Sequence, residues 1–224
     1  MKHFVCFLLG LVVIFIGVSE VTAVPITIKN TGFEAPILAD GKWTNSIPDW
    51  ITFNDGVGPG GGVGVFNPTT AHFAGEAPEG FNTAFSNGNG FYQFLSDSLT
   101  PGTYTLQVEV GDRLDTGFPG YGVRLQANTI ILAQDLSTLS PISGFKTSVV
   151  TFTADISNPN LGQPLVIALT NPGGAQVNFD NVRLDFAAAA HTPEPSTLIL
   201  FGVGALGFIG YGWQRYKQNR QEKT

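Results

Sequence analysis

The fold class is decided by the stretch Tyr104-Thr105-Leu106-Gln107-Val108-Glu109-Val110. Its even positions are apolar and its odd positions polar, which is the period of a strand with one buried face. Four other stretches also have strand character: residues 91–95, 121–126, 149–154 and 165–169. Turn signals, among them Pro101-Gly102, separate these stretches at the spacing typical of a sandwich. The sequence therefore predicts an all-β sandwich.

Residues 177–186 contain an irregularity in this period. Val177 and Phe179 are apolar at odd positions, whereas Val182, Leu184 and Phe186 are apolar at even ones. A period of two cannot change phase without an extra residue, so a β-bulge is expected near Asp180-Asn181. We expect that bulge to redirect two polar side chains near the edge of the sheet. No sustained helical period occurs between residues 24 and 190.

The N-terminus has the three parts of a secretory signal. Lys2 gives the positive region, residues 4–18 are an almost unbroken apolar run, and Val21-Thr22-Ala23 offers small residues for cleavage. We predict a signal peptide over residues 1–23, and the alternative is an uncleaved anchor. The only cysteine, Cys6, lies inside it, so the mature domain over 24–187 has no disulfide and no cysteine-based metal site.

The C-terminus contains a second apolar stretch. Residues 198–213 could cross a thin membrane as a transmembrane helix, although glycine recurs along them. Residues 214–224 contain four basic side chains, which the positive-inside rule keeps in the cytoplasm. The domain would then lie on the outer side, joined to the helix by a linker over 188–197.

That linker contains the tripeptide Pro193-Glu194-Pro195. Pro-Glu-Pro, then an apolar helix, then a basic cluster resembles the PEP-CTERM sorting signal over roughly the last 32 residues. The resemblance implies processing by an exosortase, a membrane protease of Gram-negative bacteria that make extracellular polysaccharide. The protein would be anchored in the inner membrane before processing and reach the cell surface or matrix afterwards. A plain tail anchor is the alternative.

Charge excludes one class of partner. Between the two ends the chain has six basic and fourteen acidic residues, a net charge of −8. An acidic domain without a basic patch argues against nucleic acid, and it suits neutral sugars or calcium better. The glycine-rich segment 54–64 is interpreted as a surface loop, because no lysine or helix start follows it to hold phosphate.

Three short motifs resemble the galactose-binding-like jelly roll of many carbohydrate-binding modules. They are Asn-Thr-Gly-Phe-Glu at 30–34, Ile-Pro-Asp-Trp at 47–50 and the segment 176–184 with Phe-Asp-Asn-Val. The resemblance spans nearly the whole mature domain. It implies a jelly-roll β-sandwich in which the first and last strands pair.

The same resemblance implies a structural calcium between those two strands. The matching residues are Glu34 and Asp180, with Asn30 as a third candidate and backbone carbonyls beside Gly32 as further ligands. Calcium takes six to eight oxygen ligands, so other groups are needed to complete the site. The alternative is that these residues are ordinary turn and edge carboxylates.

A ligand-binding cluster is expected in the segment that follows the deciding strand. Arg113 and Asp115 offer hydrogen bonds to sugar hydroxyls, and Phe118 or Tyr121 offers a ring face for stacking. Trp43 is a second stacking candidate. The alternative, which we favour for the loop, is an internal ion pair with Tyr121 beginning a core strand.

Catalysis has little support in the motifs. His72 is the only histidine well inside the domain, and no G-x-S-x-G motif or His/Asp metal spacing occurs. We therefore predict a non-catalytic polysaccharide-binding module that is exported and sorted by its tail. The alternatives are a structural protein of the biofilm or envelope matrix without a ligand pocket, and a glycosidase built on paired carboxylates.

Overall fold

The structure is a computed structural model that describes residues 22–53, 62–189 and 195–221. The chain divides into two units, residues 1–189 and 190–224, which are considered separately. Most of the predicted signal peptide, most of the glycine-rich loop and Pro193-Glu194 lie outside the described residues, so those predictions stay predictions. The described elements are β1 (Val24–Pro25), β2 (Trp43–Thr44), β3 (Ile51–Phe53), β4 (Val63–Phe66), β5 (Thr83–Ser86), β6 (Gly90–Ser98), β7 (Gly102–Gly111), β8 (Gly122–Ala127), β9 (Ile130–Leu136), β10 (Phe145–Ala154), β11 (Pro164–Thr170), β12 (Val177–Ala188) and α1 (Pro195–Gln221).

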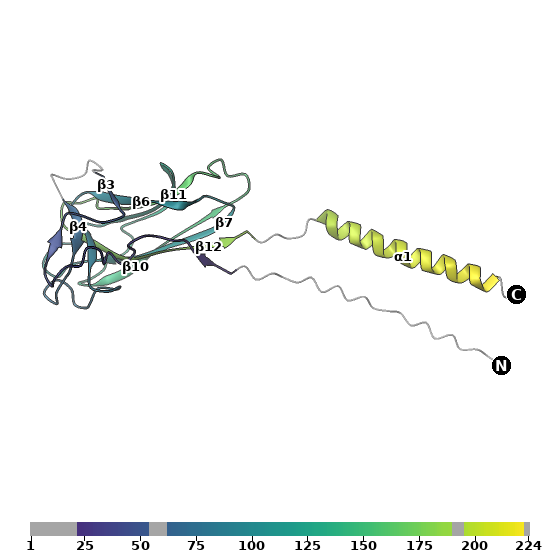
Figure 1. Cartoon of the computed structure of the whole chain (residues 1–224), viewed down its shortest axis with the longest axis horizontal. Helices are drawn as coiled ribbons and strands as arrows, with labels where there is room; N and C mark the ends of the chain where they lie inside the picture. Colours follow the sequence, from purple (N-terminus) through teal and green to yellow (C-terminus); the bar gives the residue numbers. More distant parts are fainter. Residues whose placement is uncertain (1–21, 54–61, 190–194, 222–224) are drawn as a thin grey trace, which may run out of the picture. The chain divides into compact units, whose positions relative to one another are not determined.

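The strands form two antiparallel sheets that face each other as a sandwich (Figure 1). The larger sheet has the order β10-β7-β12-β5-β4-β2, and β1 pairs with β12 beside this path. The smaller sheet has the order β3-β6-β11-β8-β9. The expected β-sandwich is therefore confirmed, and the first strand pairs with the last as expected.

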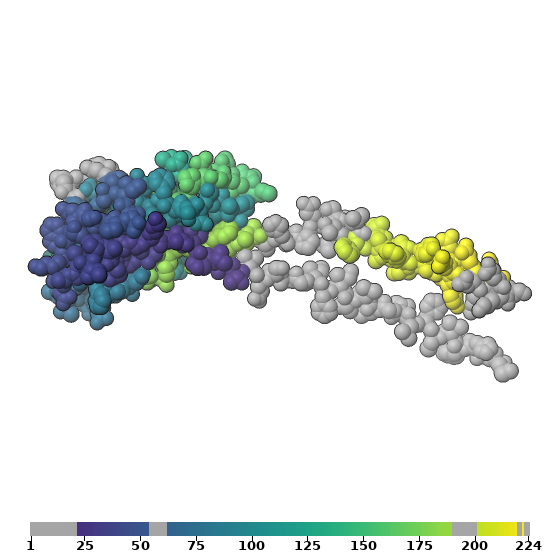
Figure 2. All heavy atoms as spheres, viewed as in Figure 1, coloured from purple at the N-terminus to yellow at the C-terminus, as the bar shows by residue number. Residues whose placement is uncertain are grey.

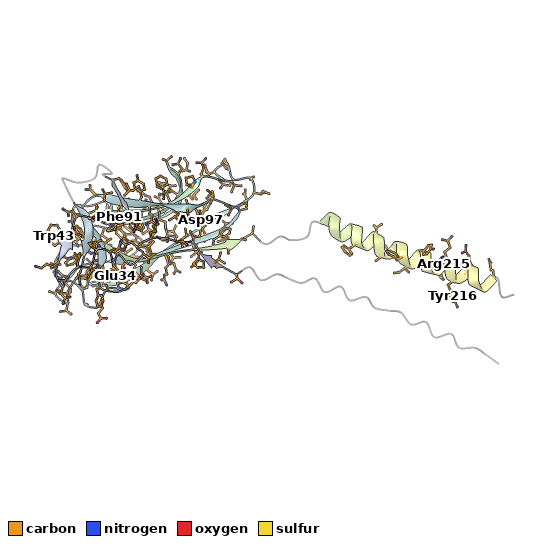
Figure 3. The ribbon with its side chains drawn as sticks, viewed as in Figure 1. Glu34, Trp43, Phe91, Asp97, Arg215 and Tyr216 are labelled. Atoms are coloured by element: carbon orange, nitrogen blue, oxygen red, sulfur yellow. The ribbon has the colours of Figure 1, made fainter. Side chains whose placement is uncertain are left out.

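The core lies between the sheets and comes from the inward positions of the alternating strands. Leu106, Val108 and Val110 of β7 are fully buried, as are Leu165 and Ile167 of β11. Burial of such side chains stabilises each by about 1.5–3 kcal/mol relative to exposure. Figure 3 shows Phe91 between the two layers.

The N-terminal residues of the described domain lie along the surface of the sandwich in Figure 2, coloured purple to blue. They are secured at two points. The backbone of Lys29 exchanges hydrogen bonds of 2.9 Å with the side chain of Gln93 on β6. Trp50, which follows in the same region, buries its ring against Phe33 and Phe91 with centroids 5.5 Å from each.

All five predicted strand stretches are strands, and the described part of residues 24–189 contains no helix. The bulge is also confirmed, because the register between β12 and β7 shifts between Asp180 and Arg183. Asn181 adopts a φ of 48° there. The expected place at a sheet edge is wrong: β12 is an interior strand between β7 and β5, so Asp180 is fully buried.

The second unit contains helix α1, which includes the whole predicted helical stretch 198–213. Among the described residues, no helix combines the length and apolar character that a membrane crossing needs. The predicted transmembrane span is therefore not found among the residues that the structure describes.

Candidate functional site

The candidate site is a cavity of about 420 Å³ on the outer face of the larger sheet, and we name it the Trp43 cavity. Its aromatic walls are Trp43 of β2, Phe66 of β4 and Phe85 of β5. Its polar lining consists of Arg113, Gln176, Asn45 and Asn87. Figure 3 places Trp43 at one end of the sandwich.

Strand alternation explains why these rings face outward. Val65 of β4 and Ala84 of β5 point into the core, so their neighbours Phe66 and Phe85 project from the opposite face. Trp43 pairs with Phe66 in the register of β2 and β4, and its ring meets that of Phe85 edge to face at 6.3 Å. This geometry is a favoured one for aromatic pairs.

Gly64 makes the approach of these rings possible. It lies opposite Phe85 in the register of β4 and β5. A Cβ at this position would collide with the carbonyl oxygen of Thr44 and lie within 2.7 Å of the Phe85 ring. Glycine therefore lets the backbone of β2 and the ring of Phe85 lie close together, which sets the shape of the cavity.

Arg113 is held firmly in the cavity wall. Its Nε and Nη2 donate to the two carboxylate oxygens of Asp115 at 2.7 and 2.5 Å, and Nη1 donates to Gln176 at 2.9 Å. Its guanidinium also lies 5.3 Å from the centroid of Phe66. These hydrogen bonds to Arg113 hold the pKa of Asp115 below its ordinary value. Arg113 thus forms the expected internal ion pair with Asp115 and also lines the cavity.

The polar contacts continue from Arg113 into the sheet. Gln176 Nε2 donates to Asn178 Oδ1 at 3.1 Å, and Asn178 Nδ2 donates to Thr83 Oγ1 at 2.8 Å. Asn178 and Thr83 are both buried, so each of these groups needs the bond it makes. The series of hydrogen bonds fixes the orientation of the Gln176 amide and, through it, of the guanidinium.

Phe118 and Tyr121 do not line this cavity. Tyr121 is fully buried, and its hydroxyl donates to Asp135 at 2.6 Å and accepts from the Leu139 backbone at 3.1 Å. Phe118 packs against the core, with its ring centroid 6.2 Å from that of Tyr121. Stacking by Phe118 or Tyr121 therefore does not apply to this cavity, and the burial of Tyr121 agrees with the favoured interpretation, in which this residue begins a core strand.

Asp135 is the buried centre of a group of hydrogen bonds that includes the Tyr121 hydroxyl. Besides Tyr121 it accepts hydrogen bonds from Ser148 Oγ at 2.6 Å and Thr138 Oγ1 at 2.7 Å. Burial raises the pKa of Asp135, but these hydroxyl hydrogen bonds offset the burial, so the pKa lies below its ordinary value. Burial and the bond to Asp135 raise the pKa of Tyr121. The group joins β9 to β10 and β8, a structural role.

The predicted calcium residues come partly together. Asp180 accepts backbone hydrogen bonds from Glu79 at 2.9 Å and Asn181 at 2.7 Å, and Glu34 accepts from Phe81 at 2.9 Å and Asn82 at 2.7 Å. Burial raises the pKa of Asp180 to about 8, and the nearby charges of Glu79 and Glu34 add to this rise.

Asn30 has another role. Its amide donates to the carbonyl oxygens of Ala35 at 3.3 Å and Pro48 at 3.0 Å, and its Oδ1 accepts from the Ala35 backbone at 3.2 Å. These contacts use the side chain to close the 30–35 turn. No group of three acidic, histidine or cysteine side chains arranged for a metal is found in the described residues. Calcium therefore stays a prediction.

Sequence reasoning identified Trp43 and Arg113 but missed Phe66, Phe85 and Gln176. The available signal was weak. Residues 63–66 and 83–86 are almost wholly buried on both faces, so they lack the alternation that marks a half-exposed strand. An apolar side chain at an outward position is a sign that something covers or uses that face.

Comparison with known proteins identifies two parts of the chain. Residues 24–185 match the HpiC1-like family, described as HpiC1 cyclase, and residues 191–215 match the PEP-CTERM protein-sorting motif. The second match supports the expected sorting signal and indicates an exported protein that exosortase sorts. A comparison with curated proteins finds no match.

Solved structures of cyclases from Fischerella resemble the domain closely. The Stig cyclase Fisc from Fischerella sp. TAU, in complex with (3Z)-3-(1-methyl-2-pyrrolidinylidene)-3H-indole, is 36% identical, with a TM-score of 0.70 over 75% of this chain and 100% of its own. An apo cyclase from Fischerella sp. is 37% identical, with a TM-score of 0.70 over 75% and 98%. A cyclase from Fischerella sp. TAU with 4-(1H-indol-3-yl)butan-2-one is 38% identical, with a TM-score of 0.64 over 74% and 99%.

These matches correct two expectations. The domain is a cyclase-like sandwich and not specifically a carbohydrate-binding jelly roll. The expectation of a non-catalytic protein is wrong as well, because the family that matches is one of enzymes. With a family model matched over residues 24–185 and relatives matched over nearly their entire length, the chain belongs to the HpiC1-like cyclase family.

Proposed function

We propose that the domain is an exported cyclase that closes a ring in a small, indole-bearing molecule held in the Trp43 cavity. Family membership supports the reaction class. Two of the similar cyclases are described with indole-bearing ligands, which supports the substrate class. The observation that carries the proposal is the aromatic cavity itself.

The cavity suits a flat aromatic molecule with polar groups at its edge. A volume of about 420 Å³ falls in the range of sites for small ligands, which are lined mainly by apolar rings and a few placed polar groups. Trp43, Phe66 and Phe85 provide the ring surface. Asn45 and Asn87 provide amide oxygens that can accept from an indole N–H.

Arg113 is placed to orient a ligand in the cavity. Asp115 and Gln176 fix the guanidinium before any ligand arrives, so a ligand does not have to order it. An oxygen or imine nitrogen on the substrate can accept from the guanidinium hydrogens that remain, and the aromatic end then lies against the rings. Such an arrangement holds the two ends of a flexible substrate in one orientation.

Ring closure benefits directly from that arrangement. When the two reacting ends are held in contact, the entropy cost of bringing them together is met on binding. This effect can lower the activation free energy of a reaction by about 7–11 kcal/mol. Aromatic faces also stabilise a positive charge that develops on a neighbouring ring. Among the described residues the lining has no carboxyl group. We therefore assign to this cavity the binding of the substrate in a folded conformation, and we assign no proton transfer to it.

The family match does not support the expected polysaccharide as a ligand of this cavity, and we propose the small indole-bearing molecule in its place. Calcium bound at Glu34 and Asp180 stays part of the proposal as a structural ion. The charges of Glu79 and Glu34 disfavour the ionised form of Asp180, and a cation bound by Glu34 and Asp180 would favour that form.

Isothermal titration of the full-length protein with 4-(1H-indol-3-yl)butan-2-one tests the proposal. Trp43→Ala removes a ring that is 62% exposed, so the fold is retained while the affinity falls at least tenfold. Phe94→Ala, which removes an exposed ring from the other sheet, is the matched control and leaves the affinity unchanged. Equal affinities for all three proteins, or no binding by the folded wild type, would refute the proposed site.

A further inference from the structure

A second cavity, of about 300 Å³, lies on the outer face of the smaller sheet, and we name it the sheet groove. It is built on three adjacent strands, β6, β11 and β8. Two cross-strand rows define it. In the first row Ala168 pairs with Tyr92 on one side and with Arg124 on the other.

In the second row Val166 lies between Phe94 and Gln126. The middle strand therefore gives a floor of small side chains, with aromatic rings along one wall and planar polar groups along the other. Val166 and Ala168 are only 2% and 3% exposed although they face away from the core, because the walls cover them. The walls stand two strand spacings apart, about 9.6 Å.

The aromatic wall is extended by a third ring. Phe53 of β3 lies 5.6 Å from Tyr92, and Tyr92 lies 5.6 Å from Phe94, centroid to centroid. Gly90 permits this row, because a Cβ there would come within 2.6 Å of the Phe53 ring. Phe94 is 48% exposed, so the row presents apolar surface to solvent. Isolated exposed rings are common, but a row of three beside a polar wall marks a binding surface.

Charge selects the kind of ligand. Arg124 is the one charged side chain of the groove lining, and its buried Nε has no hydrogen-bond partner within the described part of the chain. The Arg124 side chain lines the groove with a full positive charge, and an anionic group on a ligand would pair with its guanidinium. Gln126, Asn128 and Thr129 add amide and hydroxyl groups along the same wall.

We infer that the sheet groove binds an acidic saccharide, that is, a sugar unit carrying a carboxylate. The C–H face of a sugar ring packs on Tyr92 and Phe94, its hydroxyls meet Gln126 and Asn128, and its carboxylate pairs with Arg124. The domain as a whole has a net charge of −8 and repels polyanions, so binding of this kind requires a local site. The groove shares no lining residue with the Trp43 cavity.

The test uses oligogalacturonate and its methyl ester, in which each carboxylate is replaced by a neutral ester group. Full-length protein is titrated with each by calorimetry. We expect the free acid to bind and the ester to bind at least tenfold more weakly. Arg124→Gln reduces affinity for the acid about tenfold, and Phe94→Ala also weakens it. Arg183→Gln, an exposed arginine on the other sheet, and Trp43→Ala leave it unchanged.

Thermal unfolding of each variant shows whether it is folded. Absence of binding by the folded wild type overturns the inference, as does equal binding of acid and ester. Loss of binding in Trp43→Ala but not in Arg124→Gln assigns the saccharide to the other cavity and also overturns it. The result is independent of the indole titration, so either proposal can fail alone.

Discussion

Replacing Asp180 by Asn is expected to abolish a pH dependence that this buried carboxyl gives to the stability of the domain. Burial, with the charges of Glu79 and Glu34, raises the pKa of Asp180 from 3.8 to about 8. The folded domain therefore holds a proton on Asp180 at neutral pH, whereas the unfolded chain releases it above about pH 4.

The direction of the effect follows from these two pKa values. Between pH 4 and pH 8 the folded state binds more protons than the unfolded state, so raising the pH destabilises the fold. The difference of about four between the folded and unfolded pKa values corresponds to about 1.4 kcal/mol per pH unit and about 6 kcal/mol over the whole interval. The stabilisation is fully present below pH 4 and lost by pH 8. Such a loss is large beside the 5–15 kcal/mol typical of a domain.

The assay is urea unfolding at pH 5, 6, 7 and 8 in EDTA, for wild type and Asp180→Asn. Titrating groups far from Asp180 contribute equally to both proteins, so the difference between their slopes reports Asp180 together with its interactions with Glu79 and Glu34. Asp97→Asn, which removes an exposed carboxyl at the end of β6, is the matched control and keeps the slope of the wild type. Identical slopes for wild type and Asp180→Asn would refute the reasoning.

Calcium extends the same experiment. A cation at Glu34 and Asp180 would replace the proton, so calcium at pH 8 is expected to restore stability to the wild type and to add little to Asp180→Asn. A wild type that gains nothing from calcium would contradict the predicted calcium site and leave the proton argument intact.

Three further predictions concern other parts of the chain. Gly64→Ala forces a methyl group against β2 and Phe85, and is expected to cost about 1–3 kcal/mol in urea unfolding and to weaken indole binding, whereas Gly75→Ala, with no neighbour within 4 Å, changes neither. Tyr121→Phe leaves the buried carboxylate of Asp135 with one hydrogen bond fewer, and is expected to lower the free energy of unfolding by about 1–3 kcal/mol; an unchanged value would contradict its structural role. Replacing the Pro-Glu-Pro tripeptide by alanines is expected to block release from the membrane fraction, followed by immunoblot of fractionated cells, and normal release would contradict sorting by exosortase.

The strands that could be predicted share one physical property. β7 and β8 each bury one face and expose part of the other, so their side chains alternate in the sequence. β4 and β5 are short and nearly buried on both faces, so no alternation appears and the sequence did not reveal them. The bulge at Asp180 was predictable because a change of phase is a local signal. The burial of Asp180 could not be predicted, because it depends on the position of β12 inside the sheet and so on the strand order.

The site was predictable in its residue types and not in its assembly. Trp43 and Arg113 are 70 positions apart, and they meet at one cavity only because β2 pairs with β4, β4 with β5, β5 with β12 and β12 with β7, the strand that Arg113 follows. Phe66 and Phe85, the walls between them, come from the strands that the sequence did not reveal. The sequence favoured Tyr121 as the start of a core strand, but it gave no sign of the partner 14 positions away, Asp135, that holds the Tyr121 hydroxyl inside the core.

The error about catalysis has a similar origin. Local motifs reveal some nucleophiles and metal ligands, because in those families the reacting groups come from one short segment of the chain. The Trp43 cavity consists of rings, amides and an arginine, which do not come from one such segment. Membership of a cyclase family became visible only through similarity over the whole of residues 24–185.

A crystal structure of the protein with bound 4-(1H-indol-3-yl)butan-2-one tests the central claim most directly. We predict that the indole ring lies between Trp43, Phe66 and Phe85, with the ketone oxygen within hydrogen-bonding distance of Arg113. A ligand that binds in the sheet groove, or anywhere else on the domain while the Trp43 cavity stays empty, would contradict it.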